Sequence, residues 1–233
     1  MKLIKLGIRD LDDCLGGGFP HPCLASIEGD FGAGKTALTQ QIVCSMLRGG
    51  LRVCVVTSET TVKEYLNMMD SIKLNVYAYY LNKTMDIYPL HVEGGRWSRF
   101  LSSLFFRVTR SFLELRKEFY DAIVIDSLSV LTVDTPPHEF LTFITRMKNL
   151  VSDGKTIILT FHPKFLPENS VMKLKASSDI YLVISNAKVA GVSVKILNVV
   201  KLWGTSGERK GSITLEINPH LGLRVLPLGG VRI

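Results

Sequence analysis

The sequence lacks any long apolar segment. Hydrophobic residues make up 46% of its 233 residues and the mean hydropathy is +0.22, yet no uninterrupted apolar stretch reaches the ~18–20 residues needed to cross a bilayer. The N-terminal residues 1–13 mix lysine with aspartate and contain no apolar core of a signal peptide. We therefore expect a cytoplasmic protein, and the high hydropathy excludes intrinsic disorder.

Common metal-binding patterns are also missing. The four cysteines show no CxxC spacing and the five histidines form no HExxH motif, which argues against a zinc site and favours reduced, buried thiols. There is no internal repeat, no low-complexity segment and no linker. We therefore expect a single domain over residues 1–233.

Short apolar runs rich in Val and Ile are present instead, such as Val53–Val56 and Ala122–Ile125. Such runs are typical of strands buried on both faces, as in a parallel sheet. They predict strands at about 23–28, 52–57, 87–92, 121–126, 155–161 and 179–185, and C-terminal β-ribbons at 192–200, 213–217 and 223–226. Helical spacing predicts helices at about 35–48, 61–72, 97–118 and 138–152, the third with an apolar stripe of Leu101, Leu104, Phe105, Val108, Phe112 and Leu115. The expected fold is α/β, with a mostly parallel central sheet, flanking helices and a β-rich C-terminal end.

A glycine-rich motif follows the first predicted long strand. Residues 29–36 fit G-x-x-x-x-G-K-[ST], and the motif residues are Gly29, Asp30, Phe31, Gly32, Ala33, Gly34, Lys35 and Thr36. Glycines let backbone N–H groups turn around a phosphate, and the N-terminus of the next helix points at the same group. Lys35 would contact the β/γ-phosphates and the Thr36 hydroxyl would bind Mg²⁺. The motif predicts an ATP-binding phosphate loop.

Three further side chains follow predicted strands at the same edge of the sheet. Asp126 ends the strand at 121–126 and is the expected second Mg²⁺ ligand. Glu59 is the expected water-activating group, with a surface glutamate as the alternative. His162 is a candidate γ-phosphate sensor, and a structural role beside Pro163 is equally consistent with the sequence.

These motifs resemble the KaiC-like group of RecA-like ATPases. Leu6–Asp12 and Leu15–Pro20 resemble the opening of that group, and the resemblance covers nearly the whole chain. Shorter stretches resemble one branch, the accessory proteins of the archaellum, the archaeal swimming motor. They are Phe19–Pro22, Thr57–Tyr65, Ile87–Gly94 and Phe161–Pro163.

The resemblance implies a RecA-like P-loop fold that binds ATP with Mg²⁺ and self-associates into a ring or a smaller oligomer. It also implies a nucleotide-dependent partner of the archaellum motor ATPase FlaI, held at the inner face of the cell membrane by membrane platform and ring components.

Two positions depart from the family pattern. Many relatives carry two successive acids after the second strand, whereas Thr60 follows Glu59 here. Many also carry a Lys-x-Arg-Gly stretch that reaches the neighbouring subunit's γ-phosphate. Here Lys201 remains as the candidate inter-subunit finger, but Trp203 replaces the arginine, which favours slow hydrolysis or none. The alternative is that Trp203 is an apolar anchor and Arg209 acts as the finger.

The formal net charge of +7 keeps two other functions open. One is a RecA-like recombinase paralogue that binds single-stranded DNA through basic stretches and through loops at 133–138 and 164–175. The other is a signalling ATPase that phosphorylates itself, because Thr57, Ser58 and Thr60 are expected near the γ-phosphate.

Overall fold

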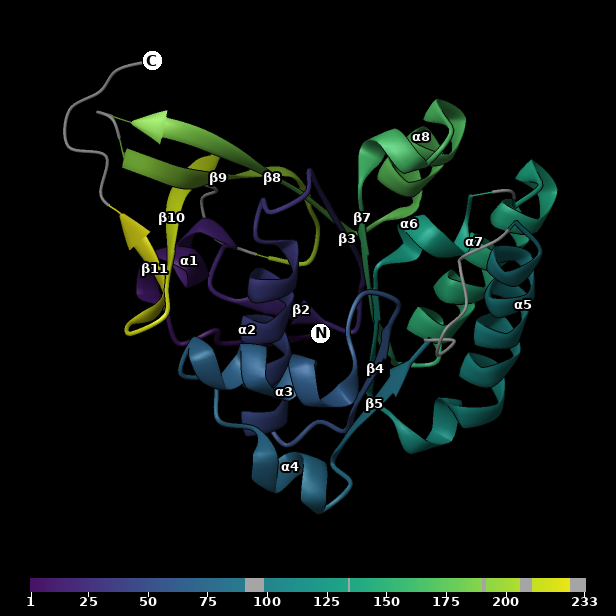
Figure 1. Cartoon of the computed structure of the whole chain (residues 1–233), viewed down its shortest axis with the longest axis horizontal. Coiled ribbons are helices and arrows are strands. Elements are labelled where there is room, and N and C mark those ends of the chain that lie inside the picture. The colour runs from purple at the N-terminus through teal and green to yellow at the C-terminus, as the bar shows by residue number, and fades with distance from the viewer. Residues whose placement is uncertain (91–98, 134, 190–191, 206–210, 227–233) are drawn as a thin grey trace.

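A large mixed sheet forms the centre of the molecule in the computed structural model, which describes residues 1–90, 99–133, 135–189, 192–205 and 211–226 (Figure 1). Within these ranges nine strands pair in the order β11-β10-β9-β8-β3-β7-β6-β4-β5. They are β3 (Leu24–Gly29), β4 (Val53–Thr57), β5 (Met85–Pro89), β6 (Ala122–Asp126), β7 (Thr156–Phe161), β8 (Ile180–Val189), β9 (Val192–Leu202), β10 (Ser212–Asn218) and β11 (Gly222–Leu226). A separate two-stranded sheet joins β1 (Lys2–Ile4) and β2 (Phe19–His21).

The sheet is parallel from β5 to β8 and antiparallel beyond β8. Strand β3 pairs in parallel with both β7 and β8, and β4 pairs in parallel with β5 and β6. The last three strands form antiparallel pairs with their neighbours, β8 with β9, β9 with β10 and β10 with β11. The predicted fold class, with its β-rich C-terminal end, is confirmed.

Helices cover both faces of the parallel strands. In Figure 1, α2 (Lys35–Arg48), α3 (Val62–Ser71) and α4 (Tyr77–Leu81) lie on one side, and α5 (Arg99–Arg116) and α7 (Pro137–Ser152) lie on the other. The remaining helical segments are α1 (Arg9–Cys14), α6 (Leu128–Leu131), α8 (Glu168–Ser177) and two short 3₁₀ turns, Lys117–Phe119 and Pro163–Phe165. No helix in the described ranges is long and apolar enough to cross a membrane.

The core lies on both faces of the sheet because successive strand side chains alternate. In β4, Val53 and Val55 join the cluster under α2 and α3, while Cys54 and Val56 join the cluster under α5 and α7. All five residues of β4 are buried. This two-sided burial explains the short Val- and Ile-rich runs of the sequence, and all four cysteines are free and buried as expected.

The helix predicted at 97–118 is α5, Arg99–Arg116, with positions 97 and 98 outside the described residues, and its expected apolar stripe is only partly right. The face of α5 against the sheet carries Ser102, Phe106, Thr109 and Leu113, whereas Leu104, Val108 and Leu115 are exposed. Helical spacing fits two adjacent faces of this helix, since apolar residues occur on both. Phe105 and Phe112 of the expected stripe are partly buried against the core, so the stripe runs along the border between the buried and the exposed face of α5.

Two other expectations differ from the structure. Strand β5 begins at Met85, two residues earlier than predicted, because Met85 and Ile87 alternate into the core; positions 91 and 92 lie outside the described residues. The stretch 164–175, expected as a DNA-binding loop, is mostly the helix α8. Of the other expected loop, 133–138, residue 134 lies outside the described residues and α7 begins at Pro137.

Candidate nucleotide-binding site

The glycine-rich motif forms a tight loop between β3 and α2. It starts at the carboxyl end of β3, between the parallel neighbours β8 and β7, and ligands of open α/β sheets bind at the carboxyl ends of strands. Gly34 is the N-cap of α2 and has a positive φ of 101°. Residues with a side chain rarely adopt this φ, and a Cβ there would also lie 2.6 Å from Cδ1 of Ile217 on β10, so the position favours glycine. The loop thus presents backbone N–H groups and a helix N-terminus to one concave space.

Lys35 is held inside this loop. Its ammonium donates to the carbonyl oxygens of Gly29 and Asp30, at 2.8 and 3.0 Å. Burial lowers the pKa of Lys35, while the charges of Glu59, Asp126 and Asp30 oppose that shift. A cation placed among three acids at a phosphate loop is a ready partner for an anionic phosphate.

The loop is supported from two sides. On one side Lys195 of β9 donates to the Gly32 carbonyl oxygen at 2.7 Å. On the other, His162 follows β7 and its Nε2 lies 3.2 Å from Oδ1 of Asp30. The His162 Nδ1 accepts from the Lys164 backbone N–H, so we assign the ring proton to Nε2, where it is directed at Asp30. The predicted proximity of His162 to the phosphate loop is present, and its sensor role stays a prediction.

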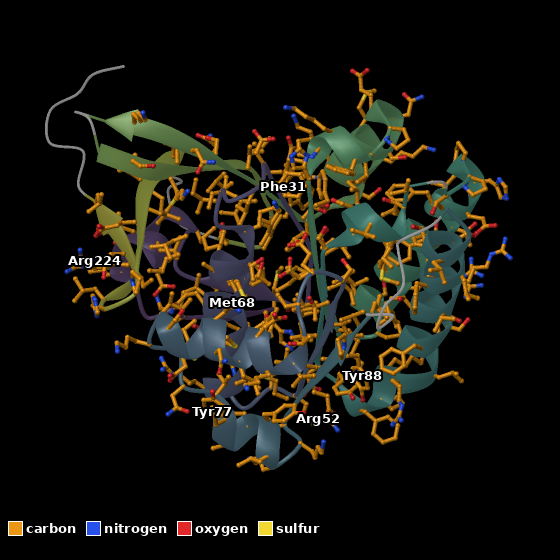
Figure 2. All side chains as sticks on the ribbon, in the orientation of Figure 1. Phe31, Arg52, Met68, Tyr77, Tyr88 and Arg224 are labelled. Carbon is orange, nitrogen blue, oxygen red and sulfur yellow. The ribbon has the colours of Figure 1, made fainter. Side chains whose placement is uncertain are left out.

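An aromatic group covers the same corner. Phe31 packs on His162, with ring centroids 4.5 Å apart, and on Phe165 at 5.6 Å. Both phenylalanine side chains are nevertheless substantially exposed. Figure 2 shows Phe31 near the upper ends of the central strands. The mouth of the loop is therefore apolar on its β7 side.

Asp126 lies at the end of β6, next to α2, as predicted. It is 2% exposed, and the Thr160 hydroxyl donates to its Oδ1 at 2.6 Å. The pKa of Asp126 is raised to about 6, chiefly by burial and also by the charge of Glu59, while the hydroxyls of Thr160 and Thr36 and the charge of Lys35 oppose the rise. The Thr36 hydroxyl is therefore close enough to Asp126 to affect the pKa of that carboxyl. Their hydroxyl and carboxylate are oxygen donors of the kind that Mg²⁺ prefers.

Glu59 follows β4 and is exposed. Its charge acts on both Lys35 and Asp126, so the acid lies at the same edge of the sheet as the loop. Its backbone N–H donates to the Thr57 hydroxyl, which in turn bonds Thr60. The position agrees with the predicted water-activating role, which stays a prediction.

Lys201 and Trp203 lie near the beginning of β8, at the opposite ends of the strands from the phosphate loop. Lys201 pairs with Tyr181 of β8, and its ammonium donates to the Ala176 carbonyl oxygen at the end of α8, at 2.7 Å. Trp203 is 68% exposed, so it is no buried anchor within this chain. The inter-subunit role of Lys201 stays a prediction, and Arg209 lies outside the described residues.

Several polar residues of the site were not predicted from the sequence. Thr160 holds Asp126, and Lys195 holds the loop. The Ser58 hydroxyl donates to the Ser127 carbonyl oxygen, and the His162 backbone N–H donates to the Ser129 hydroxyl. Thr160 could have been identified from the sequence, because it is a polar residue within the otherwise apolar run 157–161. No comparable signal marks Lys195, because its contact joins segments 163 residues apart.

The fold and this loop define a P-loop nucleotide-binding protein of the RecA-like type. Comparison with known proteins agrees: the family model "ATPase: KaiC" matches residues 4–230. The chain therefore belongs to the KaiC-like ATPase family.

An archaeal flagellar ATP-binding protein FlaH from Sulfolobus acidocaldarius is 37% identical over 97% of both chains. A protein of the same name from Methanocaldococcus jannaschii is 27% identical over 95% of this chain and 94% of its own.

Two solved structures share the fold. The crystal structure of the flagellar accessory protein FlaH from M. jannaschii superposes with a TM-score of 0.83 at 23% identity, covering 97% of this chain and all of the other. A KaiC-like protein from Pyrococcus horikoshii gives a TM-score of 0.73 at 20% identity, covering 97% of this chain and 99% of its own. The resemblance found in the sequence, both to the family and to its archaellum branch, is confirmed.

Proposed function

We propose that this protein is an ATP-binding regulatory or assembly subunit of the archaellum motor. It binds Mg-ATP as one domain over residues 1–233, hydrolyses it slowly or not at all, and engages the motor ATPase FlaI according to the nucleotide bound. The observation that carries this proposal is the phosphate loop that holds the Lys35 ammonium, with the buried Asp126 at the end of the neighbouring strand β6. The printed names of the FlaH relatives support the archaellum assignment.

The residues present fit a magnesium nucleotide. Gly34 holds a positive φ of 101° that favours glycine, and this conformation lets the backbone of the loop turn toward a phosphate. Lys35 supplies the positive charge, and Thr36 with Asp126 would hold the cation. When bound, the cation neutralises phosphate charge. The loop backbone and these side chains together would therefore bind and orient the phosphates.

Slow turnover follows from the charges available. Glu59 would orient or deprotonate a water molecule, and His162 would respond to the terminal phosphate through Asp30. An arginine finger accelerates phosphoryl transfer by about 10³–10⁵-fold. Trp203 carries no charge and gives no such acceleration, so binding rather than hydrolysis is the expected working state.

Assembly is the second part of the proposal. We infer that the chain self-associates into a ring or a smaller oligomer with Lys201 facing a neighbouring subunit. Membrane platform and ring components would hold it at the inner face of the cell membrane, beside FlaI. The exposed Phe31 and Trp203 are apolar surfaces that suit such contacts.

The test is a co-sedimentation or pull-down of FlaI by the purified protein with Mg-ATP, Mg-ADP or no nucleotide. We expect retention of FlaI to differ between Mg-ATP and the nucleotide-free protein. The Lys35→Ala variant serves as the control that no longer responds to ATP. Equal retention under all three conditions, despite measured ATP binding, contradicts the nucleotide-dependent role.

A further inference from the structure

One buried hydroxyl beside the proposed site has no hydrogen-bond partner. Tyr65 on α3 is 0% exposed, and its hydroxyl bonds no other described group. A buried polar group without a partner costs free energy comparable to a lost hydrogen bond. Such groups are rare in native proteins, and each calls for an explanation.

The position of Tyr65 connects it with the magnesium-binding corner of the site, formed by Thr36 and Asp126. Thr36 and Gln40 are four residues apart on α2 and therefore share one face of the helix. The Thr36 hydroxyl is close enough to Asp126 to lower its pKa, and the buried Gln40 amide donates to the backbone carbonyl oxygen of Tyr65 at 3.4 Å. The backbone of Tyr65 thus lies one helical turn along α2 from that corner.

Electrostatics give the same connection independently. Burial raises the pKa of Tyr65 well above its ordinary value, and the charge of Asp126 raises it further. The Tyr65 phenol and the Asp126 carboxylate therefore interact electrostatically inside the fold. No hydrogen bond joins them among the described contacts. A third group between them would give the phenol a hydrogen-bond acceptor.

A purely structural role does not explain the hydroxyl. The ring of Tyr65 belongs to the apolar cluster under α2 and α3, together with Leu38 and Met69. A phenylalanine would fill the same space without the unpaired oxygen. The hydroxyl adds nothing to the packing of the nucleotide-free protein. It would stabilise the protein only if a hydrogen-bond acceptor were placed beside it.

We propose that the Tyr65 hydroxyl is a positioning group for the site, which donates a hydrogen bond to a water molecule at the Asp126 carboxylate when Mg-nucleotide is bound. The proposal rests on the Mg-ATP binding proposed above. Tyr65 then acts through Asp126 and does not touch the phosphates. Outer partners of this kind fix the orientation of metal-binding carboxylates, and their loss weakens metal binding by about 10–100-fold.

The test compares Tyr65→Phe with Thr109→Val in the full chain. Thr109 on α5 also has a buried hydroxyl without a partner, but α5 lies on the opposite face of the sheet from α2 (Figure 1). Both variants remove one unpaired oxygen at nearly constant volume. We expect the nucleotide-free melting temperature of each to equal or exceed that of the wild type.

Binding then separates the two variants. Calorimetric titration with Mg-ATP should show roughly tenfold weaker binding by Tyr65→Phe and unchanged binding by Thr109→Val. With ATP in EDTA, wild type and Tyr65→Phe should bind alike, because the cation is absent.

Three results would overturn the inference. Wild-type Mg-ATP affinity in Tyr65→Phe removes the positioning role while leaving the proposed function intact. A lower melting temperature of nucleotide-free Tyr65→Phe shows that the hydroxyl is structural. If the wild type itself binds no Mg-ATP, the proposed function and this inference fall together.

Discussion

Replacing Asp126 by asparagine should stabilise the nucleotide-free protein while abolishing its response to Mg-ATP. Asp126 is 2% exposed, and burial raises its pKa from the ordinary 3.8 to about 6. A pKa raised by folding means that stability is full below about pH 3.8 and falls as the pH rises to about 6. The difference corresponds to about 3 kcal/mol lost by pH 8.

Asparagine keeps the shape and an oxygen acceptor for the Thr160 hydroxyl but carries no charge. Nucleotide-free Asp126→Asn should therefore melt about 6–12 °C above the wild type at pH 8. At pH 4 the two proteins should melt close together, because Asp126 is then mostly protonated. Addition of Mg-ATP at pH 8 should raise the melting temperature of the wild type only.

The assay is thermal unfolding of both proteins from pH 4 to 8, with and without Mg-ATP. A variant that is equally stable or less stable than the wild type at pH 8 would refute the argument that burial of the charge is costly. A variant that still gains stability from Mg-ATP would refute the assignment of Asp126 to the cation. Asp153→Asn, at an exposed ion pair, is a matched control that should change neither property.

Three further predictions concern the nucleotide-binding site. Lys35→Ala should fold, at a cost of about 1–3 kcal/mol for the two carbonyl partners it abandons, and should bind Mg-ATP on the order of 100-fold more weakly by calorimetry. Glu59→Gln should bind Mg-ATP within about threefold of the wild type, while any phosphate release falls by about 100-fold or more; unchanged release excludes the water-activating role. Mg-ATP affinity of the wild type should fall about tenfold per pH unit below about pH 6, since Asp126 must lose its proton to hold the cation; a flat titration contradicts this.

The parts of the fold set by local pattern were predictable from the sequence. Buried strands such as β4 and β6 stand out as short Val- and Ile-rich runs, and a glycine-rich turn before α2 identifies the phosphate loop. Thr61 and Glu64 form the capping box that their spacing indicates at the start of α3. These features depend on neighbours in the chain, so spacing and composition reveal them.

Features that depend on distant contacts were not predictable. The outer face of α5 carries Leu104, Val108 and Leu115, and no local property distinguishes it from the buried face with Phe106 and Leu113. Which face is buried depends on the packing of α5 against the sheet.

The site shows the same division. Lys35, Thr36, Asp126 and Glu59 follow strands or open a helix, and parallel strands bring their carboxyl ends to one edge of the sheet, so their proximity follows from topology. The support of the loop by Lys195 depends on the antiparallel extension, whose course the sequence indicates only as β-ribbons. The unpaired hydroxyl of Tyr65 is visible only once burial and hydrogen bonds are known.

The central claim is that this chain binds Mg-ATP and holds it rather than turning it over rapidly. Calorimetric titration of the purified protein with Mg-ATP, followed by steady-state phosphate release on the same sample, tests it most directly. We predict saturable binding that Lys35→Ala loses, with turnover far below the ~10 s⁻¹ of a typical enzyme. Absence of binding, or turnover near that rate by the isolated protein, would contradict the account.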